Sequence, residues 1–448
     1  MEKRINRGSL SMVKLTLPLA LEQFFRILVS SVDTMMLSSY SNEAVAAVGL
    51  VSQYVFFLTL VFSVIGTGTS IVLAQYLGAN KAEKSILGII RASFIMMFLV
   101  CIVITILVIC GTGPLLSCYT LEESVRNYAW QYFVIFGGIF CIFNGVNLLQ
   151  SAILRSYGYT KETMIVSVVA NIINVVGNAL SLYGFFGLPI LGVPGVAAAS
   201  GVSMLVSCIM CSYYISKKKD INFSLKGLFN IENDSFKTIL KVGVPTAGES
   251  LSYNVSQIVI MAMISTLGTY AMSAQVYCQS IVRFVFAIAV SMGHATQIKA
   301  GYYVGAKQND LAYKNIFKYQ LFATLCSMVA IAIVNIFASP LVSIFTDIPE
   351  IHSLVCDLLL YSILIEFGRT LNLIYVGALK GAGNVKFPVF YGIASMWIIM
   401  VLGSYILGLK MGLGLIGFWL AIGAEETTRG IVMLLRWKSR RWEKYALV

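Results

Sequence analysis

An acidic residue stands late in the first long apolar stretch of the chain, within the segment SSVDTMMLSS. Asp33 is costly there because a carboxylate loses its hydration in the hydrocarbon core of a membrane. Burial disfavours the charged form, so the group could take up a proton near neutral pH, and with enough oxygen neighbours it could hold Na⁺. The alternative is a structural aspartate paired with a neighbour. Arg26 lies two turns earlier on the same face but is far for direct contact.

Three asparagines follow helical spacing in the apolar segment ANIINVVGNA. Asn171, Asn174 and Asn178 lie on one face of a helix. Amides facing lipid are costly, so this face should point into the protein. The side chains could ligate a cation or hydrogen-bond Asp33, and ordinary hydrogen bonding between helices explains them equally well.

Two glutamates each follow a proline by four residues inside apolar sequence. Pro18 and Glu22 recur as Pro245 and Glu249, with the same separation of 227 residues. Arg26 is spaced for an ion pair with Glu22, whereas Glu249 has no equivalent arginine. Both glutamates are candidates for a substrate cavity, and both could instead serve a shared fold geometry.

Other polar residues in apolar stretches are further candidates for the lining of a substrate cavity. Glu366 stands three residues before Arg369, which also suits a simple ion pair. Arg283 lies deep in an apolar segment. Glutamines that could face a cavity are Gln53, Gln75, Gln275 and Gln279.

The composition indicates a protein with many membrane-spanning helices. Hydrophobic residues make up 58% of the 448 residues, charged residues 12%, and the mean hydropathy is +0.83. A helix needs roughly 20 apolar residues to cross the hydrocarbon core. We therefore expect twelve spans at 11–39, 44–77, 87–111, 127–154, 164–184, 195–215, 242–265, 271–304, 316–338, 353–378, 387–408 and 415–435.

The distribution of charge gives the expected topology. Basic residues cluster in alternate connections, which predicts that these connections and both termini are cytoplasmic in a cell membrane protein. The net charge of +12 therefore does not indicate nucleic-acid binding. The first apolar stretch is longer than a signal peptide's and should remain as a span.

The 227-residue offset indicates an internal duplication. Six spans in each half would give parallel repeats about an axis normal to the membrane, as in some secondary transporters. We expect an all-α membrane protein of two pseudo-twofold-related six-helix bundles. The amino lobe would cover 1–215, a polar, basic cytoplasmic linker 216–241, and the carboxy lobe 242–448.

Motifs for other chemistry are absent from the sequence. There is no GxxxxGK[ST] loop for an ATP-driven motor and no HExxH or Ser/His/Asp set, so we expect neither an enzyme nor a bound cofactor. Cys208 and Cys211 form a CxxC inside an apolar span, where packing is the better explanation and no disulfide is expected.

Several segments together resemble the multidrug and toxin extrusion (MATE) transporters, in a bacterial NorM/DinF-like branch. The resemblance covers nearly the whole chain. The segments that carry it are LPLALEQFFRILVSSVDTMMLSSYSNEAVAAVGL, YLGANKAEKS, LRSYGYTKETM, LGVPGVAAAS, EFGRTLNLIYVGALKGAGNVKFPV and GLIGFWLAIGAEETTRGIVMLLRWKSRRW.

The resemblance implies efflux of small organic, often cationic and amphipathic compounds in exchange for H⁺ or Na⁺. Asp33 falls on the family's acidic residue of the first helix, a proposed coupling site, and Asn174 on its fifth-helix Asn. Asn178 stands where many relatives carry Asp, and Ser200 where they often carry Thr. At Asn254 some relatives carry Glu, so a second Na⁺ site like theirs is not expected, and Asn254 is a candidate for the substrate cavity instead. We expect a monomer that meets only substrates and lipid.

Two alternatives remain at this point. A flippase for lipid-linked precursors would need a cationic cavity to hold pyrophosphate, and Arg283 keeps that option open. A receptor or other membrane protein without transport activity is the second alternative. Having few intramembrane carboxylates favours H⁺ over Na⁺, although amide, hydroxyl and backbone oxygens also bind Na⁺.

Overall fold

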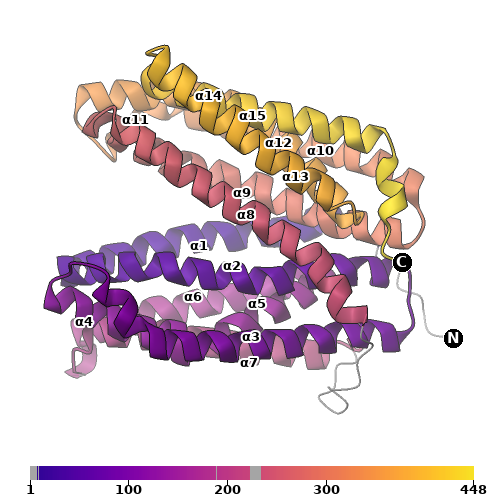
Figure 1. Cartoon of the computed structure of the whole chain (residues 1–448), viewed down its shortest axis with the longest axis horizontal. Helices are drawn as coiled ribbons and strands as arrows, with labels where there is room; N and C mark the ends of the chain where they lie inside the picture. Colours follow the sequence, from indigo (N-terminus) through magenta and orange to yellow (C-terminus); the bar gives the residue numbers. More distant parts are fainter. Residues whose placement is uncertain (1–7, 9, 188, 222–233) are drawn as a thin grey trace. The chain divides into compact units, whose positions relative to one another are not determined.

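The computed structural model describes residue 8 and residues 10–187, 189–221 and 234–448, and the regular structure in these ranges is helical (Figure 1). The α-helices are α1 (Met12–Tyr40), α2 (Asn42–Gly78), α3 (Glu83–Ser117), α4 (Glu123–Tyr132), α5 (Cys141–Ser156), α6 (Thr160–Tyr183), α7 (Gly192–Lys217), α8 (Asp234–Ser265), α9 (Thr269–Gly305), α10 (Asn309–Ile336), α11 (Ala338–Ser343), α12 (Pro349–Gly381), α13 (Lys386–Ser395), α14 (Leu402–Ser404) and α15 (Gly414–Lys438). Short π-helical segments join or extend some of them, at Phe133–Ile139, Met396–Val401 and Tyr405–Lys410, and 3₁₀ turns occur at Phe185–Gly187 and Arg441–Tyr445.

The helices match the twelve predicted spans. Within the described ranges, nine helices are long and apolar enough to cross a membrane, with Lys386–Lys410 as one of them, and α4 with α5 forms a tenth span bent by 49°. Helices α8 and α15, which carry the buried charges described below, complete the twelve. Most predicted ends lie within a few residues of the observed ones because apolar length dictates where a chain can cross the bilayer.

The chain divides into two compact units, each described here by itself. The amino unit comprises residues 21–73 and 81–244, and the carboxy unit comprises residues 1–20, 74–80 and 245–448. The first turns of α1 and the last turn of α2 thus belong to the carboxy unit, a detail that the proposed lobe boundaries did not include. Of the predicted linker, residues 222–233 lie outside the described residues, and α8 already begins at Asp234.

Each unit is built around one centrally placed helix. In the amino unit α7 packs against α6 and α5, and α3 packs against α5. In the carboxy unit α12 packs against α9, α10 and α15 (Figure 1). These contacts bring α6 and α7 together in one unit, and α9, α12 and α15 together in the other. Side chains of α1 and α8 join them through Asp33 and Glu249.

The predicted duplication reappears in the backbone. Gly158 and Gly383 both adopt positive φ, at 90° and 87°, in turns that directly follow α5 and α12. Each glycine N–H donates to the carbonyl three residues earlier, at 2.9 Å in both turns. Asn80 and Lys307, which are separated by the 227-residue offset, share the left-handed conformation after α2 and α9. Such conformations are rare outside glycine, so their recurrence supports a common origin of the two halves.

Candidate functional site

The polar residues around Asp33 form one hydrogen-bonded group inside the amino unit. The Asn178 amide Nδ2 donates to Asp33 Oδ1 at 2.9 Å and lies 3.4 Å from Asn174 Oδ1. The Asn174 amide in turn donates to the Ser200 hydroxyl at 2.9 Å. Helices α1, α6 and α7 thus supply four side chains that the sequence proposed to act together. The hydrogen bond between Asn178 and Asp33, one of the alternatives left open from the sequence, is present.

This group offers several oxygen atoms next to a single carboxylate. Asn174 and Asn178 are 9% and 2% exposed, and Asp33 is half-buried. Among the described residues, the buried Asn178 Oδ1 atom has no hydrogen-bond partner. Carboxylate, amide and hydroxyl oxygens are ligands that a hard cation accepts, so the donor set fits a proton or Na⁺ site.

The two repeated glutamates are held by equivalent basic residues. In the amino unit Arg155 binds Glu22 at 2.6 Å, and Arg26 binds the same carboxylate at 3.0 Å. In the carboxy unit Lys380 binds Glu249 at 2.6 Å. Arg155 and Lys380 are separated by 225 residues, the offset that also relates Gly158 to Gly383. The ion pair is therefore a duplicated feature of the fold.

These ion pairs fit the second interpretation of Glu22 and Glu249 given from the sequence, a shared fold geometry. Both are nearly fully buried, at 3% and 7% exposure. A buried carboxylate needs a counter-charge because it has lost its water, and each one receives a basic partner from the end of α5 or α12. The predicted pair between Glu22 and Arg26 is present, but Arg155 was missed.

The second glutamate belongs to a larger buried charge group. Arg429 on α15 also binds Glu249, on the carboxylate oxygen that Lys380 leaves free. Arg429 lies 3.8 Å from Glu425, whose carboxylate accepts a hydrogen bond from the Ser395 hydroxyl at 2.6 Å. Lys380 on α12, Ser395 on α13 and Arg429 on α15 therefore each bind a buried carboxylate in this charge group.

A neighbouring group on α12 and α15 is centred on Arg369. This arginine binds Glu366, which is fully buried, and Glu426, at 3.3 Å. Asn372 donates to the other Glu426 oxygen at 2.8 Å. The ion pair between Glu366 and Arg369 was the simpler of the two interpretations given from the sequence. Glu366 is not among the residues that line the cavity described next.

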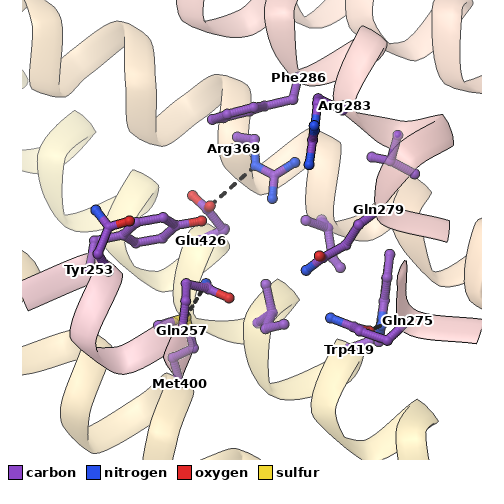
Figure 2. A pocket seen from close by; sticks show the side chains of 14 residues that line it. Tyr253, Gln257, Gln275, Gln279, Arg283, Phe286, Arg369, Met400, Trp419 and Glu426 are labelled. Carbon is purple, nitrogen blue, oxygen red and sulfur yellow. Dashed lines mark hydrogen bonds and ion pairs between the residues drawn. The ribbon is translucent and has the colours of Figure 1, made fainter. Parts of the chain in front are cut away.

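A cavity of about 400 Å³ opens within the carboxy unit between α8, α9, α12 and α15 (Figure 2). Four residues proposed from the sequence line it, namely Asn254, Gln275, Gln279 and Arg283. The remaining side chains of the wall are Tyr253, Gln257, Val282, Phe286, Ile365, Arg369, Met400, Trp419, Ile422 and Glu426. Amides, aromatic rings and two guanidinium groups therefore meet in one space.

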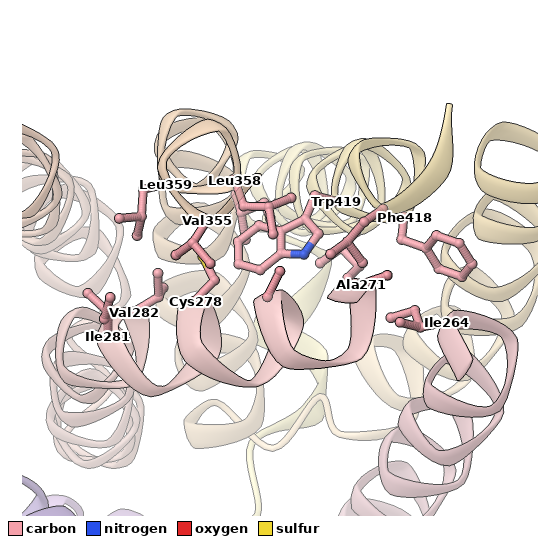
Figure 3. Close-up of a cluster of buried hydrophobic side chains, with 14 of the residues drawn as sticks. Ile264, Ala271, Cys278, Ile281, Val282, Val355, Leu358, Leu359, Phe418 and Trp419 are labelled. Atoms are coloured by element: carbon pink, nitrogen blue, oxygen red, sulfur yellow. The ribbon is translucent and has the colours of Figure 1, made fainter. Parts of the chain in front are cut away.

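The wall of this cavity is fixed by a hydrophobic core. The Trp419 indole N–H donates to Gln275 Oε1 at 2.7 Å. Behind it, Trp419 packs in a buried cluster with Cys278, Val355 and Leu358 from α9 and α12 (Figure 3). Packed side chains cannot rotate freely, so the indole face is presented in a fixed orientation.

Two proposed glutamines lie elsewhere. Gln53 is exposed on α2 and does not join the group around Asp33. Gln75 is buried in the carboxy unit, where its amide donates to the Gly381 carbonyl at 2.7 Å and accepts from the Leu447 N–H at 2.7 Å. This side chain therefore connects the end of α2 to the last residue of α12 and to Leu447.

Comparison with known proteins agrees with these observations. The MatE family model matches residues 18–180 and 245–406. The transporter YisQ of Bacillus subtilis is 35% identical over 432 residues, which cover 96% of this chain and 94% of YisQ. A probable multidrug resistance protein NorM of Thermotoga maritima is 26% identical, covering 98% and 94%. The structure of a MOP superfamily transporter from Pyrococcus furiosus has a TM-score of 0.87 at 21% identity, covering 96% and 95%.

A helical protein with twelve spans, an internal duplication and polar groups buried within its units is a multi-pass membrane transporter by its fold. The two-part family match shows that the chain belongs to the MATE family of multidrug and toxin efflux transporters. The two matched segments begin at Pro18 and Pro245, the repeated prolines that indicated the duplication in the sequence.

Proposed function

We propose that the protein is a secondary antiporter that exports small organic compounds in exchange for H⁺ or Na⁺, with Asp33 as the coupling residue. The observation that carries this proposal is the hydrogen-bonded chain from Asp33 through Asn178 and Asn174 to Ser200. It joins α1 to α6 and α7. A change of charge at Asp33 therefore acts on three helices at once.

The proposed coupling follows from what a cation does to this group. The charged carboxylate accepts the Asn178 N–H, whereas a protonated Asp33 can itself donate a hydrogen bond. Among the described residues, the Asn178 Oδ1 atom has no hydrogen-bond partner. This oxygen can accept the hydrogen bond that a protonated Asp33 donates, or it can serve as a ligand for Na⁺. Either cation neutralises the carboxylate and rearranges its contacts with α6. Cation and substrate are then linked because each favours a different arrangement of the same helices.

The bend that such a rearrangement needs has a physical cause in α1. Pro18 lies inside this helix and removes one backbone hydrogen bond. We propose that α1 repacks at this point when Asp33 is neutralised and that substrate is then released outward. We further propose that both chain termini lie on the cytoplasmic side of the cell membrane and that the protein acts as a monomer.

The coupling ion can be identified in proteoliposomes by imposing an H⁺ gradient and a Na⁺ gradient separately. We expect one of them to drive uptake of a fluorescent organic cation or anion by the wild-type protein. Asp33→Asn should remove the effect of that gradient, whereas Asn171→Ala, a change on α6 outside the hydrogen-bonded chain, should retain it. Full gradient-driven transport by Asp33→Asn would overturn the proposal.

A further inference from the structure

Arg283 lies near the middle of a membrane-spanning helix and lines the cavity of the carboxy unit. It lies within about one turn of the centre of α9, a helix about 55 Å long at 1.5 Å per residue. Among the described residues, no ion pair or hydrogen bond joins its guanidinium to another group. Its side chain is exposed at the cavity. A charged residue at this depth of a span faces a cavity or a partner and marks a pathway or a ligand site.

Glu426, the acidic residue of the cavity wall, is already bound by other side chains. Glu426 accepts from Arg369 at 3.3 Å with one oxygen and from Asn372 at 2.8 Å with the other. Arg369 is in turn satisfied by Glu426 and Glu366. Figure 2 shows Arg283, Arg369 and Gln279 among the side chains that line the cavity. The charge left to be matched in this space is therefore positive.

The rest of the wall suits a flat apolar body. Phe286, Trp419 and Tyr253 contribute aromatic rings, with the Arg369 guanidinium over one face of Phe286, and Gln257 and Gln279 contribute amides. Trp419 is held in place by Gln275 and the hydrophobic core behind it. A cavity of about 400 Å³ lies within the range that small organic ligands occupy.

We propose that this cavity binds aromatic organic compounds that carry a carboxylate or similar anionic group, with the anion on Arg283. A guanidinium group binds a carboxylate through two parallel hydrogen bonds, which gives orientation as well as attraction. The aromatic body of the ligand then lies against Phe286 and Trp419. The inference rests on the proposed export of organic compounds, and it departs from the cationic class that the family resemblance implies.

Binding to the purified full chain in detergent tests this directly. The probes are 1-naphthoate, the neutral 1-naphthalenemethanol and the cationic 1-naphthylmethylammonium, which share one ring system and differ in charge. By calorimetry we expect naphthoate to bind at least about tenfold more tightly than the other two, which corresponds to about 1.4 kcal/mol. A preference for the ammonium probe, or equal binding of all three, would overturn the inference.

Variants locate the site. Arg283→Gln should abolish the preference for naphthoate, and Arg283→Lys should keep part of it because the charge remains while the two-point geometry is lost. Arg126→Gln, a change at an exposed arginine of α4 in the other unit, is the matched control and should bind like wild type. An unchanged preference in Arg283→Gln would overturn the inference. If this variant fails to fold, the partial preference of Arg283→Lys decides the matter.

Two further results separate this inference from its alternatives. Farnesyl pyrophosphate that binds through Arg283 more tightly than naphthoate would overturn it in favour of a lipid-linked ligand. If gradient-driven transport is intact and the charge preference is absent, this inference alone fails. If naphthoate binds as expected and no cation gradient drives transport, the proposed function alone fails.

Discussion

Asp33 in the amino unit accepts a hydrogen bond from the Asn178 amide, whereas Glu249 in the carboxy unit lies between Lys380 and Arg429. The amide that contacts the first acid carries no charge. The second already has two counter-charges, and a cation would have to compete with them. The position that corresponds to Asp33 in the repeat is Ile260, a residue of the hydrophobic core at 1% exposure.

Under the proposed coupling role of Asp33, the two halves share a structural ion pair and only the amino half carries the coupling acid. The glutamates that both halves retain serve a repeated ion pair at the end of α5 or α12. The acid that only one half carries is the candidate for ion coupling. The acid that recurs in both halves is therefore assigned a structural role, and the acid that does not recur is the candidate for a functional one.

The largest expected effect on stability is at Glu249. Glu249→Gln leaves Lys380 and Arg429 buried without their shared carboxylate, and removing one partner of a buried pair costs about 3–5 kcal/mol. Thermal unfolding of the purified protein in detergent should show a large fall in the melting temperature. An unchanged melting temperature would mean that this carboxylate is not a structural counter-charge and would break the comparison with Asp33.

A smaller effect is expected at the equivalent pair of the amino unit. Arg155→Met leaves Glu22 with Arg26 alone, and Arg155 is 28% exposed, so water can compensate in part. We expect a loss of about 1–3 kcal/mol, the range for an unsatisfied buried group. Exchanging the charges in Glu22→Arg with Arg155→Glu should recover part of it, measured by the same unfolding assay. No recovery would indicate that the two side chains do not act as a pair.

The smallest stability effect is expected at Asn178. Hydrogen bonds between membrane helices contribute about 0.6 kcal/mol on average, so Asn178→Ala should unfold almost like wild type. Its cation dependence of transport should nevertheless change, because the acceptor and donor beside Asp33 are lost. Asn171→Ala is the control on the same helix. Equal transport and equal cation dependence in both variants would remove Asn178 from the coupling group.

The helices and one of the two polar groups could be predicted from the sequence. Apolar length alone positions the spans, and helical spacing alone places Asn174 and Asn178 on one face. The link from Asn178 to Asp33 was one of two readings, because the sequence does not say which helix lies opposite. The ion pair of Glu366 with Arg369 was predictable, since both residues lie on one helix.

The remaining contacts depend on packing between distant segments. Arg155 and Lys380 stand 133 and 131 residues from their glutamates, and nothing local connects them. A signal was nevertheless available, because both precede a repeated turn glycine at the same offset. The cavity could not be predicted, because it requires the side chains of α8, α9, α12 and α15 to converge. Only its members Asn254, Gln275, Gln279 and Arg283 were named beforehand.

The most direct test measures cation movement driven by substrate in proteoliposomes without an imposed ion gradient. Internal pH and Na⁺ are followed while substrate moves, for wild type, Asp33→Asn and Glu249→Gln, per folded molecule. We predict opposite movement of one cation in wild type and in the folded fraction of Glu249→Gln, and none in Asp33→Asn. Cation movement at the wild-type ratio in Asp33→Asn would contradict the account.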